Sequence, residues 1–305
     1  MISHFFKLSI ICFYITSFSQ FGFSQNQIEG VSSFGAIKIL GKIDVDINIP
    51  ITSSKAENVY VLAIGNEDYA SYQTGISKES NVDFAANDAK IFSEYCIKTL
   101  GVPERQVKVL INATSAQIKQ GLAWLSDLAA IEGGNAILYF YYSGHGLPHE
   151  GTKEPYLIPV DVNGGQIELA IPLKTIYSSL NKNPIKKGIV ILDACFSGGA
   201  RNQPLITAKA VRVRPREPLL SDNILVISSS TGEESSGIYS DKQHGFFTYF
   251  LLKKLQESKG KITYGELFDY VNRNVLKETA ISGKKQTPVA NSGASDIWKD
   301  WVVIP

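Results

Sequence analysis

The chain has 305 residues, of which 44% are hydrophobic and 19% are charged. This apolar content can build one large core or two modest ones, and it excludes a wholly disordered chain. Thirty Lys and Arg residues against 29 Asp and Glu residues give a net charge of +1, so no overall field favours nucleic acid or an anionic membrane. Three cysteines and four histidines exclude a disulfide scaffold and a four-cysteine zinc site, and we expect no histidine-rich metal centre.

Residues 1–24 have the pattern of a secretory signal peptide. A Lys and a His precede the apolar run 8–18, which is too short to cross a bilayer because that takes roughly 20 residues. Gly22 and Ser24 supply the small residues of a cleavage site, which we place after Ser24. Cleavage would remove Cys12 and leave an exported protein, periplasmic or secreted, with no stable membrane insertion. An uncleaved amphipathic anchor is the alternative.

Residues 25–57 form an N-terminal arm in which apolar residues alternate with polar ones from Ile43 to Ile49. This period of two is typical of a half-exposed strand or an extended arm.

From residue 58 onward, continuous apolar runs predict buried strands, and apolar residues at helical spacing predict helices. The strands are expected at 59–64, 106–111, 136–142, 188–192 and 224–227, and the helices at 81–100, 114–131, 172–180, 246–256 and 264–276. This alternation predicts a mainly parallel sheet with helices on both sides, an α/β sandwich of about 250 residues.

Two of these strands run directly into glycine-rich turns that carry reactive side chains. The strand 136–142 is followed by SGHG, which contains His145, and the strand 188–192 is followed by DACFSGG, which contains Cys195. Ligands bind beyond the carboxyl ends of parallel strands, so we expect both side chains to emerge at the same edge of the sheet. An imidazole there could take the proton of the thiol, and backbone N–H groups at Gly146 and Cys195 could stabilise an oxyanion.

The other cysteine and histidines of the predicted domain fit ordinary structural roles. Cys96 lies on the apolar stripe of a helix, as a small buried hydrophobe does. His149 and His244 are interpreted as surface or capped residues. An exported protein with two cysteines has either a bridge or a thiol kept for chemistry, and the motif around Cys195 favours the thiol.

The paired motifs resemble the histidine and cysteine motifs of the caspase-like superfamily of cysteine peptidases. His145 precedes Cys195 by 50 residues, which is the spacing of caspase-type proteases. YSGHG at 142–146 and DACFSG at 193–198 are most similar to bacterial members of metacaspase type, as are YVLAIGNEDY at 60–69, ANDA at 86–89 and HGFFT at 244–248. The resemblance covers residues 58–303. It implies a catalytic domain at 58–305 with the caspase–hemoglobinase fold, a three-layer α/β/α sandwich, and endopeptidase activity through a thioester acyl-enzyme.

The resemblance also assigns roles. Cys195 becomes the nucleophile, His145 the general acid and base, and Gly146 an oxyanion donor. The acidic pocket by which metacaspases select Arg or Lys falls on Asp88, Ser143 and Asp193. A buried carboxylate is costly unless a cation pairs with it, so this pocket suits protein or peptide substrates with Arg or Lys at the cleavage site. Caspases that cut after Asp carry Gln-Ala-Cys, and the Asp-Ala-Cys sequence of this chain argues against that specificity.

Calcium dependence is common among metacaspases but is not expected for this chain. Asp161 fits one ligand position of the family, whereas the acidic pair expected near Glu168 is missing and Asn202 replaces a carboxylate. Because a hard cation needs several carboxylate oxygens, we expect no metal and no other cofactor. Nothing in the sequence explains Phe196, which stands where many metacaspases have His.

A basic segment with three prolines follows the cysteine motif, at 201–222. It is either a solvated loop or an activation loop. In the second case the purified protein should cut itself between Arg201 and Arg216, and Cys195→Ala should stay intact.

Two other functions stay open from the sequence. One is a catalytically silent caspase-like module that binds basic peptides or a partner protein. The other is an amidase or transpeptidase, because an amine can also capture a thioester. The intact pair of His145 and Cys195 favours an exported, metal-independent endopeptidase that cuts after Arg or Lys, which we expect to be a monomer without a nucleic-acid partner.

Overall fold

The computed structural model describes residues 42–196, 219–232, 234–293 and 296–304. The chain divides into two units, 1–39 and 40–305, and all of these residues belong to the second. The expected signal peptide at 1–24, with Cys12, lies outside the described residues, as do Asn202 and the part of the basic segment up to residue 218.

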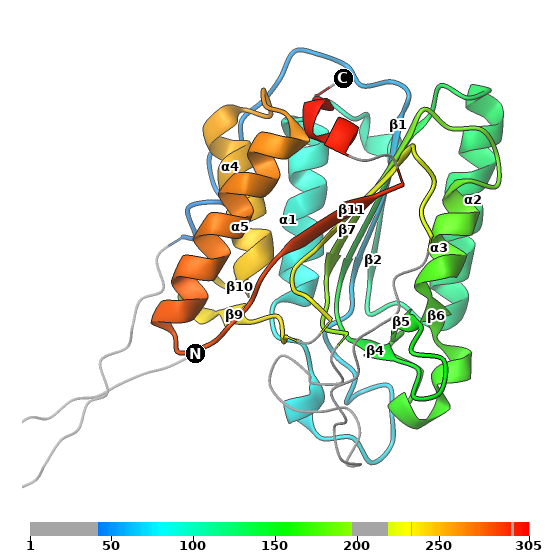
Figure 1. Cartoon of the computed structure of the whole chain (residues 1–305), viewed down its shortest axis with the longest axis vertical. Helices are drawn as coiled ribbons and strands as arrows, with labels where there is room; N and C mark the ends of the chain where they lie inside the picture. Colours follow the sequence, from blue (N-terminus) through cyan, green and yellow to red (C-terminus); the bar gives the residue numbers. More distant parts are fainter. Residues whose placement is uncertain (1–41, 197–218, 233, 294–295, 305) are drawn as a thin grey trace, which may run out of the picture. The chain divides into compact units, whose positions relative to one another are not determined.

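A six-stranded sheet forms the centre of the unit (Figure 1). Its strands are β1 (Val59–Gly65), β2 (Val107–Ile111), β3 (Ile137–Ser143), β7 (Lys187–Asp193), β8 (Ile224–Ser228) and β11 (Val289–Ser292). The order across the sheet is β11-β8-β7-β3-β1-β2, and all neighbours are parallel except β11, which is antiparallel to β8. Every residue of β1 and β3 is buried, as expected for strands covered on both faces.

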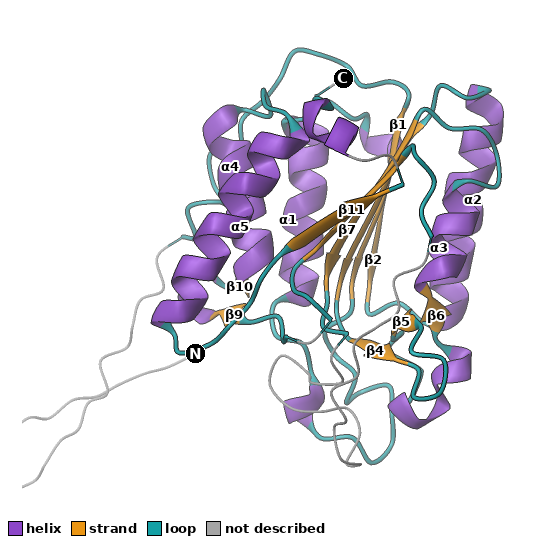
Figure 2. Ribbon diagram, in the orientation of Figure 1, coloured by secondary structure: helices purple, strands orange, loops and turns teal. Residues whose placement is uncertain are grey.

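Helices cover both faces of this sheet (Figures 1 and 2). On one side lie α1 (Ala85–Lys98), α4 (Phe246–Ser258) and α5 (Tyr264–Ile281), and on the other α2 (Ser115–Glu132) and α3 (Leu173–Leu180). Alternate strand residues feed the two layers: Val61 packs into the core with α1, α4 and α5, and Leu62 into the core with α2 and α3. The three-layer α/β/α sandwich is therefore confirmed. In the described part of the chain, no helix has the length and apolar character needed to cross a membrane.

Short elements lie between the main strands and helices in the chain. β4 (Gly146–Pro148), β5 (Pro155–Leu157) and β6 (Ile171–Pro172) form a small antiparallel sheet, and β9 (Ile238–Tyr239) pairs with β10 (His244–Gly245). The 3₁₀ turns are η1 (Lys78–Ser80), η2 (Glu104–Gln106), η3 (Gly164–Leu169), η4 (Ser240–Lys242) and η5 (Asp296–Asp300). Such short runs carry no readable periodicity, and the sequence predicted none of them.

Residues 42–57 of the N-terminal arm contain no strand, so the alternation of this segment does not mark one. The chain turns at residues 44–46 and buries Ile43 and Val45 in the core beside α1 and α4. The Tyr95 hydroxyl of α1 donates to the carbonyl of Val45 at 2.9 Å. The Gln256 side chain of α4 donates to the carbonyls of Asp44 and Ile47, each at 2.9 Å. The arm is therefore held by two helices rather than by a neighbouring strand.

Candidate active site

The register of β3 and β7 brings the two reactive side chains to one edge of the sheet. Ser143 at the end of β3 pairs with Asp193 at the end of β7, and His145 and Cys195 each follow two residues later. The Gly144 N–H donates to the Asp193 carbonyl at 3.3 Å, which ties the two strand ends together. His145 and Cys195 are each only 4% exposed. The carboxyl edge of the sheet therefore holds an imidazole and a thiol, on the segments that follow two adjacent strands.

The glycine after His145 allows a close approach to the cysteine. A Cβ added at Gly146 would lie 2.7 Å from the Phe196 ring and 2.8 Å from the Cys195 carbonyl oxygen. Phe196, which the sequence left unexplained, is buried in the core on the α2 and α3 side and fills the space beside this glycine. The β4–β5 ladder bond runs from Ile158 N–H to the His145 carbonyl at 3.0 Å. Gly146 is thus in a non-hydrogen-bonded pair, and its N–H faces away from β5.

A neutral carbonyl orients the His145 ring. Nε2 lies 2.6 Å from the carbonyl oxygen of Ser80, at the end of η1. A carbonyl only accepts hydrogen bonds, so Nε2 carries the proton and Nδ1 is the nitrogen that can exchange one. The Tyr69 ring packs against the imidazole with centroids 4.5 Å apart, and its hydroxyl accepts the His145 backbone N–H at 3.0 Å. Neither Ser80 nor Tyr69 was singled out from the sequence as part of the site.

Backbone from the segment after β8 contacts the sulfur of Cys195. The Ser236 N–H donates to Sγ at 2.6 Å, and the Ser236 carbonyl lies 3.8 Å from Sγ. The hydroxyl of Ser236 is hydrogen-bonded to that of Ser229, which lies 3.3 Å from the Ala194 carbonyl. An N–H aimed at sulfur stabilises a negatively charged sulfur more than a neutral thiol. Ser229 follows β8 directly and Ser236 lies 7 residues further along the chain, but the sequence analysis selected neither.

The three expected specificity residues form one buried cluster next to this edge. The Ser143 hydroxyl donates to Asp88 Oδ2 at 3.0 Å, and Ser143 is the register partner of Asp193. The Thr248 hydroxyl of α4 donates to Asp193 Oδ2 at 2.8 Å. Asp88, Ser143 and Asp193 are fully buried. The structure therefore brings together Asp88 of α1, Ser143 of β3 and Asp193 of β7, the residues that the resemblance assigned to a common pocket.

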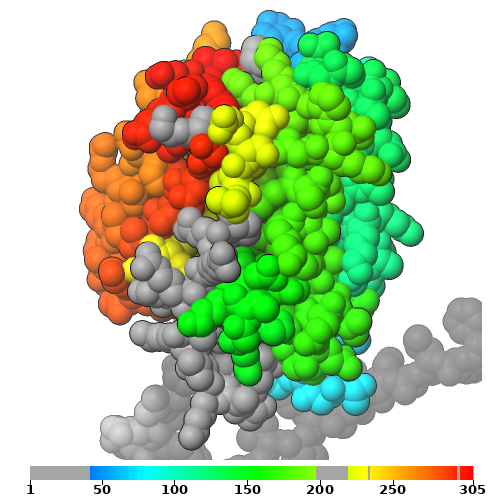
Figure 3. Space-filling view, turned by 45° about the vertical axis from the view of Figure 1, so that its right-hand side comes forward, coloured from blue at the N-terminus to red at the C-terminus, as the bar shows by residue number. Residues whose placement is uncertain are grey.

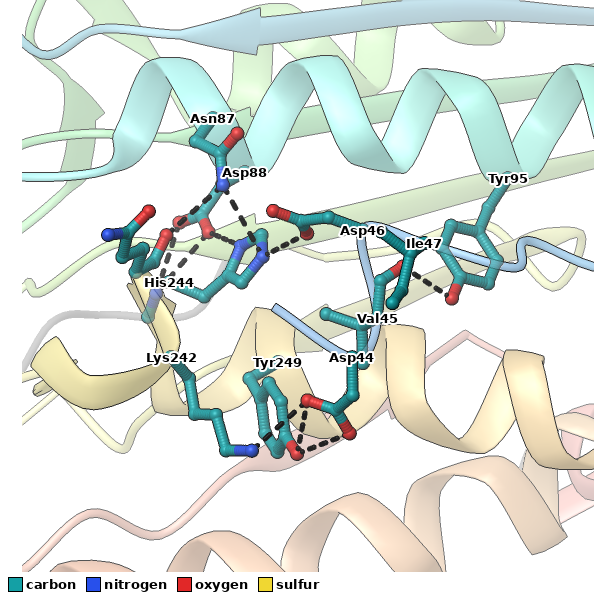
Figure 4. Close-up of polar contacts among 12 residues, drawn as sticks. Asp44, Val45, Asp46, Ile47, Asn87, Asp88, Tyr95, Lys242, His244 and Tyr249 are labelled. Atoms are coloured by element: carbon teal, nitrogen blue, oxygen red, sulfur yellow. Dashed lines mark hydrogen bonds and ion pairs between the residues drawn. The ribbon is translucent and has the colours of Figure 1, made fainter. Parts of the chain in front are cut away.

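His244 is also part of this cluster, so of the two roles expected for it, surface or capped, the surface role is wrong. It is fully buried, with Nδ1 2.7 Å from Asp88 Oδ1 and Nε2 2.8 Å from Asp46 Oδ1 (Figure 4). Burial lowers its pKa, but the hydrogen bonds to Asp46 and Asp88 outweigh this effect and raise the pKa to about 9. By contrast, His149 is capped as expected, because its Nδ1 accepts the N–H groups of Gly151 and Thr152.

An apolar hollow lies beside Phe196, on the side of the sheet that α2 and α3 cover. It is lined by side chains from α3, β8 and the cysteine motif, among them Leu173, Tyr177, Phe196, Val226 and Ser230. Figure 3 views the face on which residues 219–232, in yellow, lie beside α3, in light green. Phe196, which follows Cys195 in the chain, is part of its lining.

The model of the caspase domain family matches residues 58–296. The chain belongs to the caspase domain family. Members of this family are cysteine peptidases. The comparison with curated proteins gives no match. Among solved structures, a protein from Geobacter sulfurreducens is similar with a TM-score of 0.60 and 19% identity, over 81% of this chain and 99% of that one. Caspase-1 from Spodoptera frugiperda is similar with a TM-score of 0.52 and 16% identity, over 81% of this chain and 91% of that one. These two likenesses show the caspase-like fold.

The remaining cysteine of the caspase domain is structural. Neither Cys96 nor Cys195 forms a disulfide, and Cys96 is buried on α1, where burial raises its pKa far above the usual range. A protonated thiol in a core does not act as a nucleophile. Of the two, Cys195 alone lies at the strand edge.

The described residues do not fit a calcium site. Asp161 Oδ1 accepts the Ser115 N–H at 2.8 Å, next to the start of α2, and Glu168 is an exposed residue 3.9 Å from His149. Within the described ranges, no group of three or more His, Cys, Asp or Glu side chains is arranged so that it could hold a metal ion. We therefore derive no catalytic step through a metal.

Proposed function

We propose that the chain is an endopeptidase that cleaves after Arg or Lys, with Cys195 as nucleophile and His145 as general acid and base. The observation that supports this proposal is the parallel pairing of Ser143 with Asp193, because the segments that carry His145 and Cys195 follow these two strand ends at the same carboxyl edge of a caspase domain. Proteins and peptides are the substrates that such a domain takes.

In the first half of the reaction, His145 Nδ1 takes the thiol proton while Nε2 stays on the Ser80 carbonyl. Sγ of Cys195 attacks the carbonyl carbon of the scissile bond, and the oxygen becomes an oxyanion. The N–H groups of Gly146 and Cys195 donate to that oxyanion. The C–N bond then breaks, His145 returns its proton to the leaving amine, and the acyl group remains on Cys195 as a thioester.

In the second half, water replaces the amine. His145 takes a proton from the water as it attacks the thioester carbonyl, and the tetrahedral intermediate again places its charge toward the same N–H groups. The C–S bond breaks, the peptide acid leaves, and the proton on His145 restores the thiol. The Ser236 N–H stabilises the sulfur when it leaves with negative charge.

The specificity for Arg or Lys rests on the cluster of Asp88, Ser143 and Asp193. Two buried carboxylates form an environment in which a cationic side chain gains charge-assisted hydrogen bonds and a neutral one does not. A hydrogen bond to a charged group contributes about 1.5–3 kcal/mol, which corresponds to a preference of tenfold or more. The hollow beside Phe196 is suited to an apolar part of the same peptide.

We further propose that the protein is exported after cleavage behind Ser24, and that it works without a metal or other cofactor. The support for export is the sequence pattern of residues 1–24. Export is tested by the N-terminal sequence of the mature protein, which should begin at Gln25. Metal independence is tested by activity in a chelator, which should equal activity with added calcium.

The test of the peptidase itself uses a peptide with a single Arg and a second peptide in which citrulline replaces that Arg. The wild-type protein should cut the first after Arg, and an arginyl chloromethyl ketone should add its mass to Cys195. Cys195→Ala should show neither cleavage nor labelling, while the matched variant Cys96→Ala, which changes the core thiol, keeps both. A wild-type protein that neither cuts nor becomes labelled would favour the catalytically silent module instead.

A further inference from the structure

His244 is held by a carboxylate at each ring nitrogen. Asp88 on α1 lies 2.7 Å from Nδ1, and Asp46 on the N-terminal arm lies 2.8 Å from Nε2 (Figure 4). An ionised carboxylate only accepts hydrogen bonds, so both ring nitrogens must carry a proton. The pair of contacts therefore selects the imidazolium form of His244.

The cation and its two partners form a charge set that includes one of the specificity residues. The Asp46 and Asp88 carboxylates together with the His244 imidazolium have a net charge of one negative unit. The Asp193 carboxylate adds a second negative charge to the cluster. Without Asp46, the imidazolium would cancel Asp88, and the recognition site would lose half of its charge. Asp46 therefore compensates for a buried cation that would otherwise weaken the attraction of an Arg or Lys side chain.

The arm is anchored in a way that holds Asp46 in place. The neighbouring Asp44 pairs with Lys242 at 3.1 Å and with Lys253 at 3.0 Å, and it accepts the Tyr249 hydroxyl. Asp46 itself is partly exposed, with its side chain at 22%. Asp44 thus attaches the arm to η4 and α4, whereas Asp46 forms the ion pair with His244.

The elements packed near His244 carry further charged and titratable groups. These include Asp44 on the arm, Glu67 before α1, Asp241 and Lys242 on η4, and Tyr249 and Lys253 on α4. The nearest polar neighbour besides the carboxylates is the neutral amide of Asn87, 3.4 Å from Nε2. The two direct ion-pair contacts of His244 are those with Asp46 and Asp88.

We propose that His244 and Asp46 are positioning residues of the recognition site: they fix the Asp88 carboxylate and keep the charge of that site constant across the neutral pH range. This inference rests on the proposed function, because it concerns how that site recognises Arg. The Asp88 carboxylate is further fixed by the Gly245 N–H, at 3.3 Å from Oδ1, and by the Ser143 hydroxyl. The N-terminal arm thereby becomes part of substrate recognition although it lies outside the region that matches the family model.

The first test measures the ratio of kcat/KM for the Arg peptide to kcat/KM for the citrulline peptide as a function of pH. Protonation of His145 or Cys195 affects both peptides equally and cancels in this ratio. In the wild-type protein the ratio should stay flat from about pH 6 to about pH 8, because His244 stays charged throughout. In Asp46→Asn the ratio should fall about tenfold as the pH is lowered from about 8 to about 6. His244 then becomes an imidazolium whose charge offsets that of Asp88, and no Asp46 carboxylate compensates for it.

Two further variants isolate the cause. Asp44→Asn removes a charge from the same arm without touching His244, so its ratio should stay flat. The double variant D46N/H244N removes the titrating group and keeps one negative charge, so its ratio should be flat again. Equal behaviour of Asp46→Asn and Asp44→Asn, or a flat ratio in Asp46→Asn, would overturn the proposal.

A second measurement needs no turnover and no variant at Asp46. In the full chain with Cys195→Ala and isotope-labelled histidine, NMR should show His244 doubly protonated at neutral pH, and H244N identifies its signal among the four histidines. A neutral His244 in a protein that cleaves after Arg would overturn this inference alone. A cationic His244 in a protein that never cleaves would overturn the peptidase proposal and, with it, the recognition role.

Discussion

His145 and His244 are buried imidazoles near the same edge of the sheet, yet their ring nitrogens meet different partners. The Nε2 atom of His145 lies on the neutral carbonyl of Ser80, whereas both nitrogens of His244 lie on carboxylates. A carbonyl fixes the tautomer and lets the ring change its charge, which proton transfer requires. Two carboxylates hold both protons on the ring, and a ring that keeps both protons cannot act as a base. The partners of an imidazole, rather than its burial, separate the two roles.

The largest effects are expected when each imidazole is removed in turn, which tests the different roles proposed for His145 and His244. His145→Ala should lower kcat by at least about a hundredfold for the Arg peptide and the citrulline peptide alike, because general acid–base catalysis is lost. His244→Asn should act mainly on KM for the Arg peptide and leave kcat for the citrulline peptide near the wild-type value. Steady-state kinetics of both variants decide this, and equal losses of kcat would contradict the division of roles.

The fixed charge of His244 should also appear in the stability of the protein. The pKa of about 9 in the folded state lies above the ordinary value of 6.5, so the folded protein holds this proton more tightly than the unfolded chain. The resulting stabilisation is fully present below pH 6.5 and is lost as the pH rises through about 9. It amounts to at most about 3 kcal/mol.

Urea unfolding of the wild type and His244→Asn near pH 6 and above pH 9 measures this contribution. The difference in the free energy of unfolding between the two proteins should shrink as the pH rises. A difference that stays constant over this range would show that His244 does not titrate with folding.

Asp193 shares the buried cluster with Asp88 and accepts a hydrogen bond from the Thr248 hydroxyl, so its removal sharpens the comparison. Asp193→Asn should lower the preference for Arg over citrulline by about tenfold or more at every pH, since it removes a carboxylate without leaving an uncompensated cation. Peptide competition assays over the pH range measure this preference. Asp161→Asn, distant from the cluster, is the control and should leave the preference unchanged.

The smallest effect is expected at Asp44, which anchors the arm without entering the cluster. Burial works against its ionised form, but hydrogen bonds to Lys253, Lys242 and Tyr249 lower its pKa to about 2. Its contribution is therefore present above the ordinary pKa of 3.8 and lost as the pH falls toward 2. The side chain is 38% exposed, so solvent screening limits the effect of Asp44→Asn to about 1 kcal/mol or less at neutral pH.

Denaturant unfolding at neutral pH and near pH 2 tests this prediction, with Asp269→Asn, an exposed residue of α5, as the matched control. The difference from wild type should vanish at the acidic end for Asp44→Asn. A loss of several kcal/mol at neutral pH would mean that the whole arm detaches.

The sequence predicted the sandwich because its buried strands and long helices carry strong patterns. Strands β1, β3 and β7 are continuous apolar runs, and α2 and α5 begin with capping boxes at Thr114 and Thr263. It did not predict β11, since a short edge strand of VANS sequence has neither the length nor the apolar character of the others. The arm was ambiguous for a related reason: alternation also arises when a turn buries every second residue against helices.

The placement of His145 and Cys195 at one edge of the sheet was predictable because each residue follows its own strand closely, and the parallel pairing of the two strands aligns their ends. The partners of those residues were not. Ser80 lies 65 positions before His145, Ser236 lies 41 positions after Cys195, and Asp46 lies 198 positions before His244. No local pattern links residues at such separations. Only the folded chain shows that an isolated histidine in HGFFT has two carboxylates around it.

The burial of Ile43 and Val45 has a practical consequence for anyone who prepares this enzyme. A recombinant fragment trimmed to the region recognised by the family profile would start at residue 58 and discard both side chains together with Asp46. It would keep Cys195 and every main strand, yet leave an unfilled apolar gap along α1 and α4. Preparations for assays should therefore retain the chain from before residue 42.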